Sequence, residues 1–114
     1  RINRAKGDYA QLKAELADSG SLRGRVFSQY KRMLEIRGGL PALSPFGDAA
    51  YDCHGPVFEI KRTHGDQTFY ALHNFSDQSQ SVDDLPAGLV DAFTAEPLRD
   101  HQCQLGPFEF RWLR

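Results

Sequence analysis

The stretch FEIKRTHGDQTFYALHNF, residues 58–75, decides the fold. Apolar and charged residues alternate through residues 58–61, a period of two that is typical of a strand with one buried face. His64-Gly65-Asp66 supplies a tight turn, and residues 67–75 follow it as a second strand. The segment therefore predicts an antiparallel β-hairpin.

Short runs of the same kind continue to the end of the chain, separated by Gly, Pro, Asp, Asn and Ser. Weaker strands are predicted at residues 81–82 and 89–93, and a last one at residues 108–113. We expect this last strand to bury Phe108, Phe110 and Trp112 together on one face. Six or seven short strands at spacings of about ten residues favour a sandwich or a barrel over βαβ units, and we predict a small antiparallel sandwich of Greek-key type.

The first forty residues instead follow a helical period. Asp8 is a predicted N-cap with Gln11 three residues later, as in a capping box, and Ser21 is predicted to cap a second, longer helix. Gly38-Gly39 followed by Pro41 ends it. The fold class is thus α+β, with a helical segment at 1–43 and a β-sandwich at 44–114. Two amphipathic helices do not form a bundle alone, so their apolar stripe needs the sandwich or a missing larger domain as cover.

Composition is that of a globular chain: 40% of residues are hydrophobic, 25% are charged and the net charge is −1. No run approaches the roughly 20 apolar residues of a membrane span, so no membrane partner is expected. Because the chain starts in a polar, basic run without an initiator Met, we interpret it as a fragment. Residues 1–43 carry a charge balance of +5 and residues 44–114 one of −6. No aromatic-interleaved basic stripe is present, so no nucleic-acid partner is predicted.

Cysteine and histidine spacing argues against a metal centre. Cys53 and Cys103 lie fifty residues apart, which favours free thiols in a reducing cytoplasm, with one cross-strand bridge as the alternative. Adjacent Cys53 and His54 would point to opposite faces of a strand, and the pair His101 and Cys103 lacks two further ligands nearby. We therefore predict no metal, no cofactor and a cytoplasmic location.

Five phrases in order resemble the end of the catalytic barrel and the C-terminal β-domain of glycoside hydrolase family 13, the α-amylase superfamily. They are residues 1–4 (RINR), 30–43 (YKRMLEIR through LPAL), 71–77 (ALHNFSD), 91–96 (DAFTAE) and 105–113 (LGPFEFRWL). Leu40 and Leu43 stand where the family's H-P-A-F phrase has His and Phe. Within the family, the first and third phrases look most like sucrose phosphorylases.

The resemblance implies a non-catalytic domain that braces the barrel of an enzyme transferring glucose from sucrose or a related glucoside to phosphate. Such enzymes work by retaining double displacement with two carboxylates. Those carboxylates lie on barrel strands upstream of this segment, and no residue here matches their motifs. We therefore assign no catalytic residue and expect the isolated chain to be inactive.

Three N-terminal residues are the predicted substrate-binding residues: Arg1, Asn3 and Arg4. The resemblance places them in the loop after the last barrel strand, where Arg could hold phosphate or an acceptor carboxylate in the intact enzyme. The alternative is that these three are ordinary loop residues with no role in binding. The expected partners are the upstream barrel and, only in the intact enzyme, sugar and phosphate; a homo-oligomer through the exposed helix face is the further option.

A second hypothesis makes the chain a free-standing carbohydrate-binding β-module. Trp112, Tyr51 and Tyr70 could then stack on sugar rings, although Trp112 is predicted to lie in the sandwich core. The two hypotheses differ in what they leave exposed. The first predicts an uncovered apolar stripe on the helices, and the second predicts an aromatic platform on the sandwich.

Overall fold

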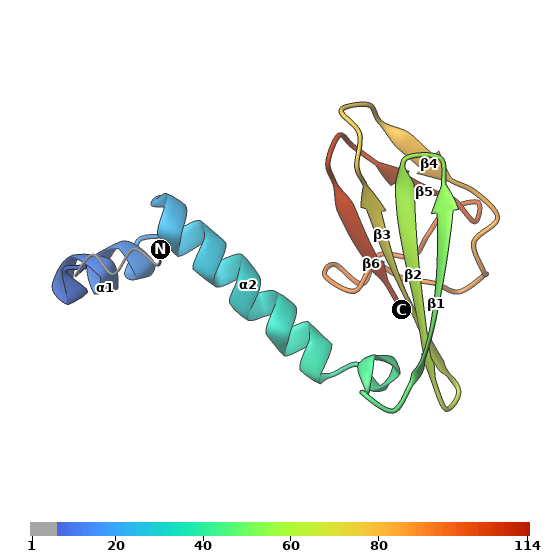
Figure 1. Ribbon diagram of the computed structural model, residues 1–114, viewed down its shortest axis with the longest axis horizontal. Coiled ribbons are helices and arrows are strands. Elements are labelled where there is room, and N and C mark those ends of the chain that lie inside the picture. The colour runs from blue at the N-terminus through green and yellow to red at the C-terminus, as the bar shows by residue number, and fades with distance from the viewer. Residues whose placement is uncertain (1–6) are drawn as a thin grey trace, which may run out of the picture. The chain divides into compact units, whose positions relative to one another are not determined.

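The computed structural model describes residues 7–114 and divides the chain into two compact units, Arg1–Arg37 and Gly38–Arg114 (Figure 1). Residues 40–43 therefore belong with the sandwich. The predicted domain boundary after Leu43 concerns an intact enzyme and stays a prediction. Within residues 7–114, no helix is long and apolar enough to cross a membrane.

The helical unit contains α1 (Tyr9–Ala17) and most of α2 (Leu22–Gly38). Asp8 is the N-cap of α1, as predicted, because its Oδ1 accepts hydrogen bonds from the backbone N–H groups of Ala10 and Gln11 at 2.8 and 3.2 Å. The Gln11 side chain donates to Glu15 Oε1 at 2.9 Å. It does not reach back to Asp8, so the predicted capping box is only half formed.

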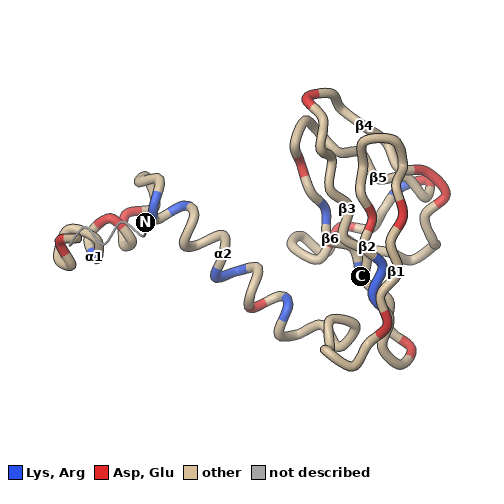
Figure 2. Tube along the Cα trace, in the orientation of Figure 1, with Lys and Arg blue, Asp and Glu red and all other residues tan. Residues whose placement is uncertain are grey.

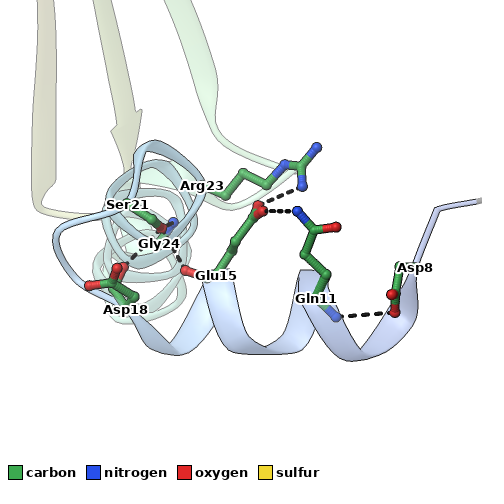
Figure 3. A network of polar contacts seen from close by, with 7 residues as sticks. All are labelled: Asp8, Gln11, Glu15, Asp18, Ser21, Arg23 and Gly24. Carbon is green, nitrogen blue, oxygen red and sulfur yellow. Dashed lines mark hydrogen bonds and ion pairs between the residues drawn. The ribbon is translucent and has the colours of Figure 1, made fainter.

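A tight corner joins α1 to α2 (Figure 3). Ser21 caps α2, as predicted, because its Oγ accepts from Gly24 N–H at 2.9 Å. The same hydroxyl lies 2.6 Å from the carbonyl oxygen of Glu15 and 2.9 Å from that of Asp18. A Cβ on Gly24 would stand 2.0 Å from the Asp18 oxygen, so only glycine fits there. The Ser21 hydroxyl and the lack of a Cβ at Gly24 thus determine the conformation of this corner.

The second unit opens with a short 3₁₀ helix, η1 (Pro41–Leu43), and continues as six strands: β1 (Asp48–His54), β2 (Val57–His64), β3 (Gln67–Asn74), β4 (Gln80–Val82), β5 (Cys103–Leu105) and β6 (Phe110–Leu113). One antiparallel sheet has the order β1-β2-β3-β6, and β4 pairs with β5 in a second (Figure 1). The predicted hairpin is β2–β3, whose turn uses Gly65 at a φ of +61°.

The apolar core lies between the two sheets, which confirms the sandwich architecture. Its members come from five strands, β2 to β6, and from the β4–β5 connection: Val57, Tyr70, Leu72, Val82, Leu85, Leu89, Cys103, Leu105 and Leu113. Of these, Val57, Leu72, Val82, Leu105 and Leu113 are at most 1% exposed. This unit therefore carries its own hydrophobic core.

The strand predicted at residues 89–93 forms only isolated bridges, Val90 to Pro97 and Asp91 to Leu113. The Asp91 carboxylate stops it by accepting hydrogen bonds from the N–H groups of Phe93 at 2.7 Å and Thr94 at 3.0 Å. These bonds bend the chain into a turn. Before the turn, Ala92 N–H donates to the Trp112 carbonyl, so this segment lines the outer edge of β6.

The prediction that Phe108, Phe110 and Trp112 enter the sandwich core is wrong. Phe108 precedes β6 in a turn, at a φ of 52°, and is 71% exposed. Phe110 and Trp112 do share a face, but it is the face turned away from the second sheet. The core takes Leu113 from the alternate positions of the same strand, because that face meets β4 and β5.

Candidate functional site

The helical unit exposes a continuous apolar surface, here called the helix stripe. Its members on α2 are 50–69% exposed: Leu22, Val26, Phe27, Tyr30 and Leu34. The single buried residue of α2 is Gly24, and α1 has none. Within its described residues this unit has no apolar core of its own. The uncovered stripe is what the first of the two hypotheses predicts.

The sandwich exposes a second apolar surface on the outer side of its larger sheet. Directly paired residues of antiparallel strands point to the same face, so the register defines three rows across this side. The rows are Ala49-Arg62-Phe69, Tyr51-Ile60-Ala71-Trp112 and Cys53-Phe58-His73-Phe110. Arg62 is the one charged residue in them, and none carries a carboxylate.

Part of this side is already covered. Leu40, Ala42 and Leu43, in and beside η1, pack against Phe69, Ala71, Ile60 and Trp112. The Arg62 guanidinium donates to the Ser44 carbonyl at 2.6 Å and so fastens the segment that follows η1. The end of the sheet farther from η1 stays open, where Tyr51 is 66% exposed, Phe75 69% and Phe110 38%.

The aromatic rings on and beside this side, here called the aromatic face, form two groups by ring contact. Tyr51 stacks on Phe58, and the second group is His73, Phe75, Phe93, Phe110 and Trp112. His73 stacks on Phe110 with centroids 5.9 Å apart. Phe93 meets Phe110 edge-on at 71°, and Trp112 meets Phe110 at 61°. Phe110 is therefore stacked with His73 but edge-on to Phe93 and Trp112. Burial lowers the pKa of His73, so its neutral ring form is favoured.

Charged residues gather on the inner side of the same sheet, at the alternate strand positions. Asp52, Glu59 and Arg111 share one row there with Leu72, and Lys61 lies over the Tyr70 ring at 5.7 Å. Tyr70 is 5% exposed, so its predicted availability for sugar stacking is wrong. Figure 2 shows acidic and basic positions along these strands. A sheet with one solvated side normally keeps its polar residues on that side. Here the outer side is apolar.

A buried clasp built on Asn74 holds the end of β3. Its Nδ2 donates to the carbonyl oxygens of Gln78 at 2.7 Å and Gly106 at 2.8 Å. Its Oδ1 accepts from Ser76 N–H at 3.0 Å and Ser76 Oγ at 2.8 Å. All its hydrogen-bonding groups are used, which explains how an amide stays 3% exposed. The clasp fixes the turn that carries Phe75.

A cluster of charged residues lies beside an open cleft of about 270 Å³ next to β5 and β6. Asp91 and Glu109 both bind the Arg111 guanidinium, at 3.2 and 2.9 Å. Burial acts to raise the pKa of Asp91, but hydrogen bonds from Thr94, Phe93 and Arg111 outweigh it and leave the pKa below its ordinary value. Arg111 therefore pairs with two carboxylates at once, and the three residues together keep one negative charge.

Burial raises the pKa of the neighbouring Cys103 thiol to about 11. A thiol of that pKa stays protonated at neutral pH and is a poor nucleophile. Both cysteines are free, with Cys103 buried and Cys53 exposed. Among residues 7–114, no three His, Cys, Asp or Glu side chains gather closely enough to hold a metal ion. His54 pairs with Glu59 at 2.8 Å, and His101 Nδ1 lies 3.0 Å from the Leu85 carbonyl oxygen.

Arg1, Asn3 and Arg4 lie outside the described residues, so their predicted role in substrate binding stays a prediction. The aromatic face was missed because the sequence was interpreted as having one apolar face per strand. A signal was present: β3 is apolar at both its odd and its even positions, as a strand covered on both sides would be.

The comparisons with known proteins found one similar sequence and several similar folds. The chain is 30% identical over 90 residues to a glucosylglycerate phosphorylase from Allomeiothermus silvanus. The aligned residues make up 79% of this chain and 16% of that protein. The fold of this chain matches that of AmyP, solved in complex with maltose, at a TM-score of 0.67 and 21% identity. The match covers 82% of this chain and 21% of AmyP.

The trehalulose synthase MutB from Pseudomonas mesoacidophila MX-45 matches equally well. Its TM-score is 0.67 and its identity 23%, over 89% of this chain and 19% of that one. No family model matches the chain. The chain spans about a fifth or less of the length of each of these proteins. In such enzymes the C-terminal domain is non-catalytic. Sequence and fold together assign the chain to the C-terminal region of glycoside hydrolase family 13 enzymes, the α-amylase superfamily.

Proposed function

We propose that the chain is the C-terminal part of a retaining glucoside phosphorylase resembling sucrose phosphorylase. The intact enzyme would transfer glucose from sucrose, or from a related glucoside such as glucosylglycerate, to phosphate. The observation that carries this proposal is the 30% identity over 90 residues to a protein named as a phosphorylase. The solved structures named for maltose binding and trehalulose synthesis are only 21–23% identical.

Within that enzyme the chain has a structural role, with residues 1–43 closing the catalytic barrel and residues 44–114 bracing it. The exposure of the helix stripe supports this role. Five large apolar side chains on one helix, each at least 50% exposed, form a surface that a stable protein normally covers. The Cys103 thiol, whose pKa burial raises to about 11, is a poor nucleophile at neutral pH, and the Asp91 and Glu109 carboxylates are both paired with Arg111.

The test is an assay of the protein encoded by the complete gene. We expect phosphate-dependent release of glucose 1-phosphate from sucrose or glucosylglycerate by the longer protein, and no turnover of either by the 114-residue chain. Sugar release that is independent of phosphate would contradict a phosphorylase. Turnover by the isolated chain would contradict a non-catalytic domain.

Arg1, Asn3 and Arg4 are proposed to hold phosphate or the acceptor in that enzyme. Replacing Arg4 by Ala should raise the KM for phosphate about tenfold or more, since a charge-assisted hydrogen bond is worth about 1.5 to 3 kcal/mol. The KM for the glucoside should change less. The matched control is Lys13→Ala, a cation on the exposed part of α1. Equal KM values for phosphate in both variants would remove Arg4 from the site.

A carbohydrate-binding module is the second candidate, favoured by the exposure of Tyr51 and Phe75 on the sandwich. It predicts that sucrose or maltose, added at millimolar concentration, changes the NMR chemical shifts of these two rings in the isolated chain. A titration without any such shift would leave the structural role as the sole candidate.

A further inference from the structure

We infer that two copies of this chain pair through the free edge of β1, as antiparallel strands centred on Tyr51. β1 is an edge strand of the larger sheet, since within residues 7–114 it pairs with β2 alone. Six of its seven residues are exposed. The opposite edge is covered, because the backbone of residues 90–92 is hydrogen-bonded to that of Trp112 and Arg114. Of these two edges, only that of β1 therefore offers unpaired backbone to another strand.

The register of β1 with β2 determines which backbone groups of β1 face outward. His54 and Val57 flank the two-residue turn that joins the strands, so they form a hydrogen-bonded pair. Such pairs recur at every second position. The N–H and C=O groups of Ala49, Tyr51 and Cys53 are consequently turned away from β2. The edge thus presents three residues that can bond to a further strand.

The charges of β1 complement a second copy of the same strand. Pairing about a two-fold axis makes each contact twice. When the axis passes through Tyr51, Ala49 lies opposite Cys53 of the second copy, and all three outward-facing residues are hydrogen-bonded. Asp48 then lies opposite His54 of the second copy, so a carboxylate meets an imidazole at both ends of the pair.

Other registers of the same pair are less favourable. An axis at Ala50 places Asp48 opposite Asp52 of the second copy, and an axis at Asp52 places that carboxylate opposite its own copy. Like charges directly opposite each other destabilise a strand pair. Axes at Ala49 and at Cys53 leave most of β1 unpaired. The strand also contains no Lys and no Pro, which commonly keep an edge from pairing. The central register is therefore favoured.

Asp52 limits the strength of this pairing. Its Oδ1 accepts a hydrogen bond from Cys53 N–H at 2.7 Å, so one of the three outward donors is already bound. On pairing, that N–H must exchange the carboxylate for the Ala49 carbonyl of the second copy. Asp52→Ala removes the competing acceptor. It should lower the dissociation constant of the dimer about threefold to tenfold.

Ala49→Cys tests the register. Positions 49 and 53 of one strand lie about 13 Å apart, too far for a disulfide, but across the inferred pair they lie about 5.5 Å apart. Mild oxidation should therefore link position 49 to Cys53 of a second copy. Chymotrypsin cleaves after Tyr51 and separates the two positions, so mass spectrometry distinguishes 49–53 links from 53–53 links. We expect the 49–53 links to be in about fivefold excess or more.

Tyr51→Pro tests the hydrogen bonds at the centre of the pair. It removes an N–H group that faces away from β2, and an edge strand tolerates Pro at such a position. Tyr51→Thr is the matched control, because it keeps the N–H group. In sedimentation equilibrium, Tyr51→Pro should raise the dissociation constant of the dimer about tenfold or more, and Tyr51→Thr about threefold or less. Trp112 fluorescence checks that both variants are folded.

Three outcomes would overturn the inference. The first is a chain that stays monomeric in sedimentation equilibrium at about 1 mM. The second is an equal dissociation constant for Tyr51→Pro and Tyr51→Thr, which would place the contact on another surface such as the helix stripe. The third is an excess of 53–53 links, which would contradict the register centred on Tyr51. None of these measurements involves sugar or phosphate, so they are independent of the proposed phosphorylase activity.

Discussion

The two units of this chain differ in how far their apolar residues are buried. In the sandwich, Leu72, Leu105 and Leu113 are at most 1% exposed between two sheets, whereas Phe27 and Leu34 of the helical unit are each 50% exposed. Both patterns look amphipathic in sequence. The difference is that the sandwich meets its own second sheet, and the described helical residues contain no partner of that kind. Stability should therefore be concentrated in residues 38–114.

The largest expected effect on stability comes from a change in the sandwich core, and it tests whether stability resides in residues 38–114. Leu72→Ala should lower the free energy of unfolding of the 114-residue chain by about 2 to 5 kcal/mol, since it leaves a cavity in a closed core. Leu34→Ala should change it by less than about 0.5 kcal/mol, because the side chain is already half in water. Urea unfolding followed by Trp112 fluorescence measures both. Comparable losses would mean that the helix stripe is covered in solution.

A smaller loss is expected from the Asn74 clasp. Asn74→Ala removes the hydrogen-bond partner of two backbone carbonyl groups and of Ser76, and should cost about 1 to 3 kcal/mol in the same unfolding experiment. Gln78→Ala is the control, because Asn74 bonds to the backbone oxygen of Gln78 and not to its side chain. If the two variants were equally stable, the clasp would contribute nothing beyond a surface turn.

Local signals in the sequence predicted the local structure well. The Asp8 and Ser21 caps need only one side-chain oxygen and the N–H groups two or three residues on, so their spacing fixes them. The β2–β3 turn likewise needs only Gly65 at positive φ. These features involve neighbouring residues, and no distant part of the chain can change them.

The choice of faces could not be predicted in the same way. In β6 the alternate positions offer Phe110 and Trp112 on one side and Arg111 and Leu113 on the other, so the sequence favours the side of the two rings as the core. Which side becomes the core depends on where β4 and β5 return, a pairing of distant residues that the period of two does not encode. The larger rings were assigned to the core, and they form the aromatic face instead.

Stability of the sandwich should also depend on pH through His73. Burial among aromatic rings lowers the pKa of His73 from 6.5, so the unfolded chain binds the proton more readily than the folded one. Stability should be full above about pH 6.5 and fall as the pH drops through the lower pKa of the folded state. Unfolding by urea at pH 7.5 and at steps down to pH 5 measures this dependence.

The variant His73→Phe identifies the group responsible. It keeps an aromatic ring against Phe75 and Phe110 but cannot be protonated, so the decline between pH 6.5 and 5 should become smaller. The other ionisable groups are the same in both proteins, including His54 beside Glu59. An identical pH profile with and without His73 would contradict the prediction.

The smallest effect on overall stability should come from the corner of the helical unit, although its local effect is large. In Gly24→Ala the new Cβ would meet the Asp18 carbonyl oxygen at 2.0 Å, so the turn between α1 and α2 must open. Amide hydrogen exchange at residues 18–24 should accelerate. The free energy of unfolding of the sandwich should stay within about 0.5 kcal/mol of the parent chain.

Gly38→Ala is the matched control, since a Cβ at Gly38 would meet nothing within 4 Å. It should leave exchange at the corner unchanged. If Gly24→Ala instead lowered the stability of the sandwich by the amount expected for Leu72→Ala, the two units would form one cooperative structure. The helix stripe would then already be covered by its partner, and the inferred difference in stability between the two units would be wrong.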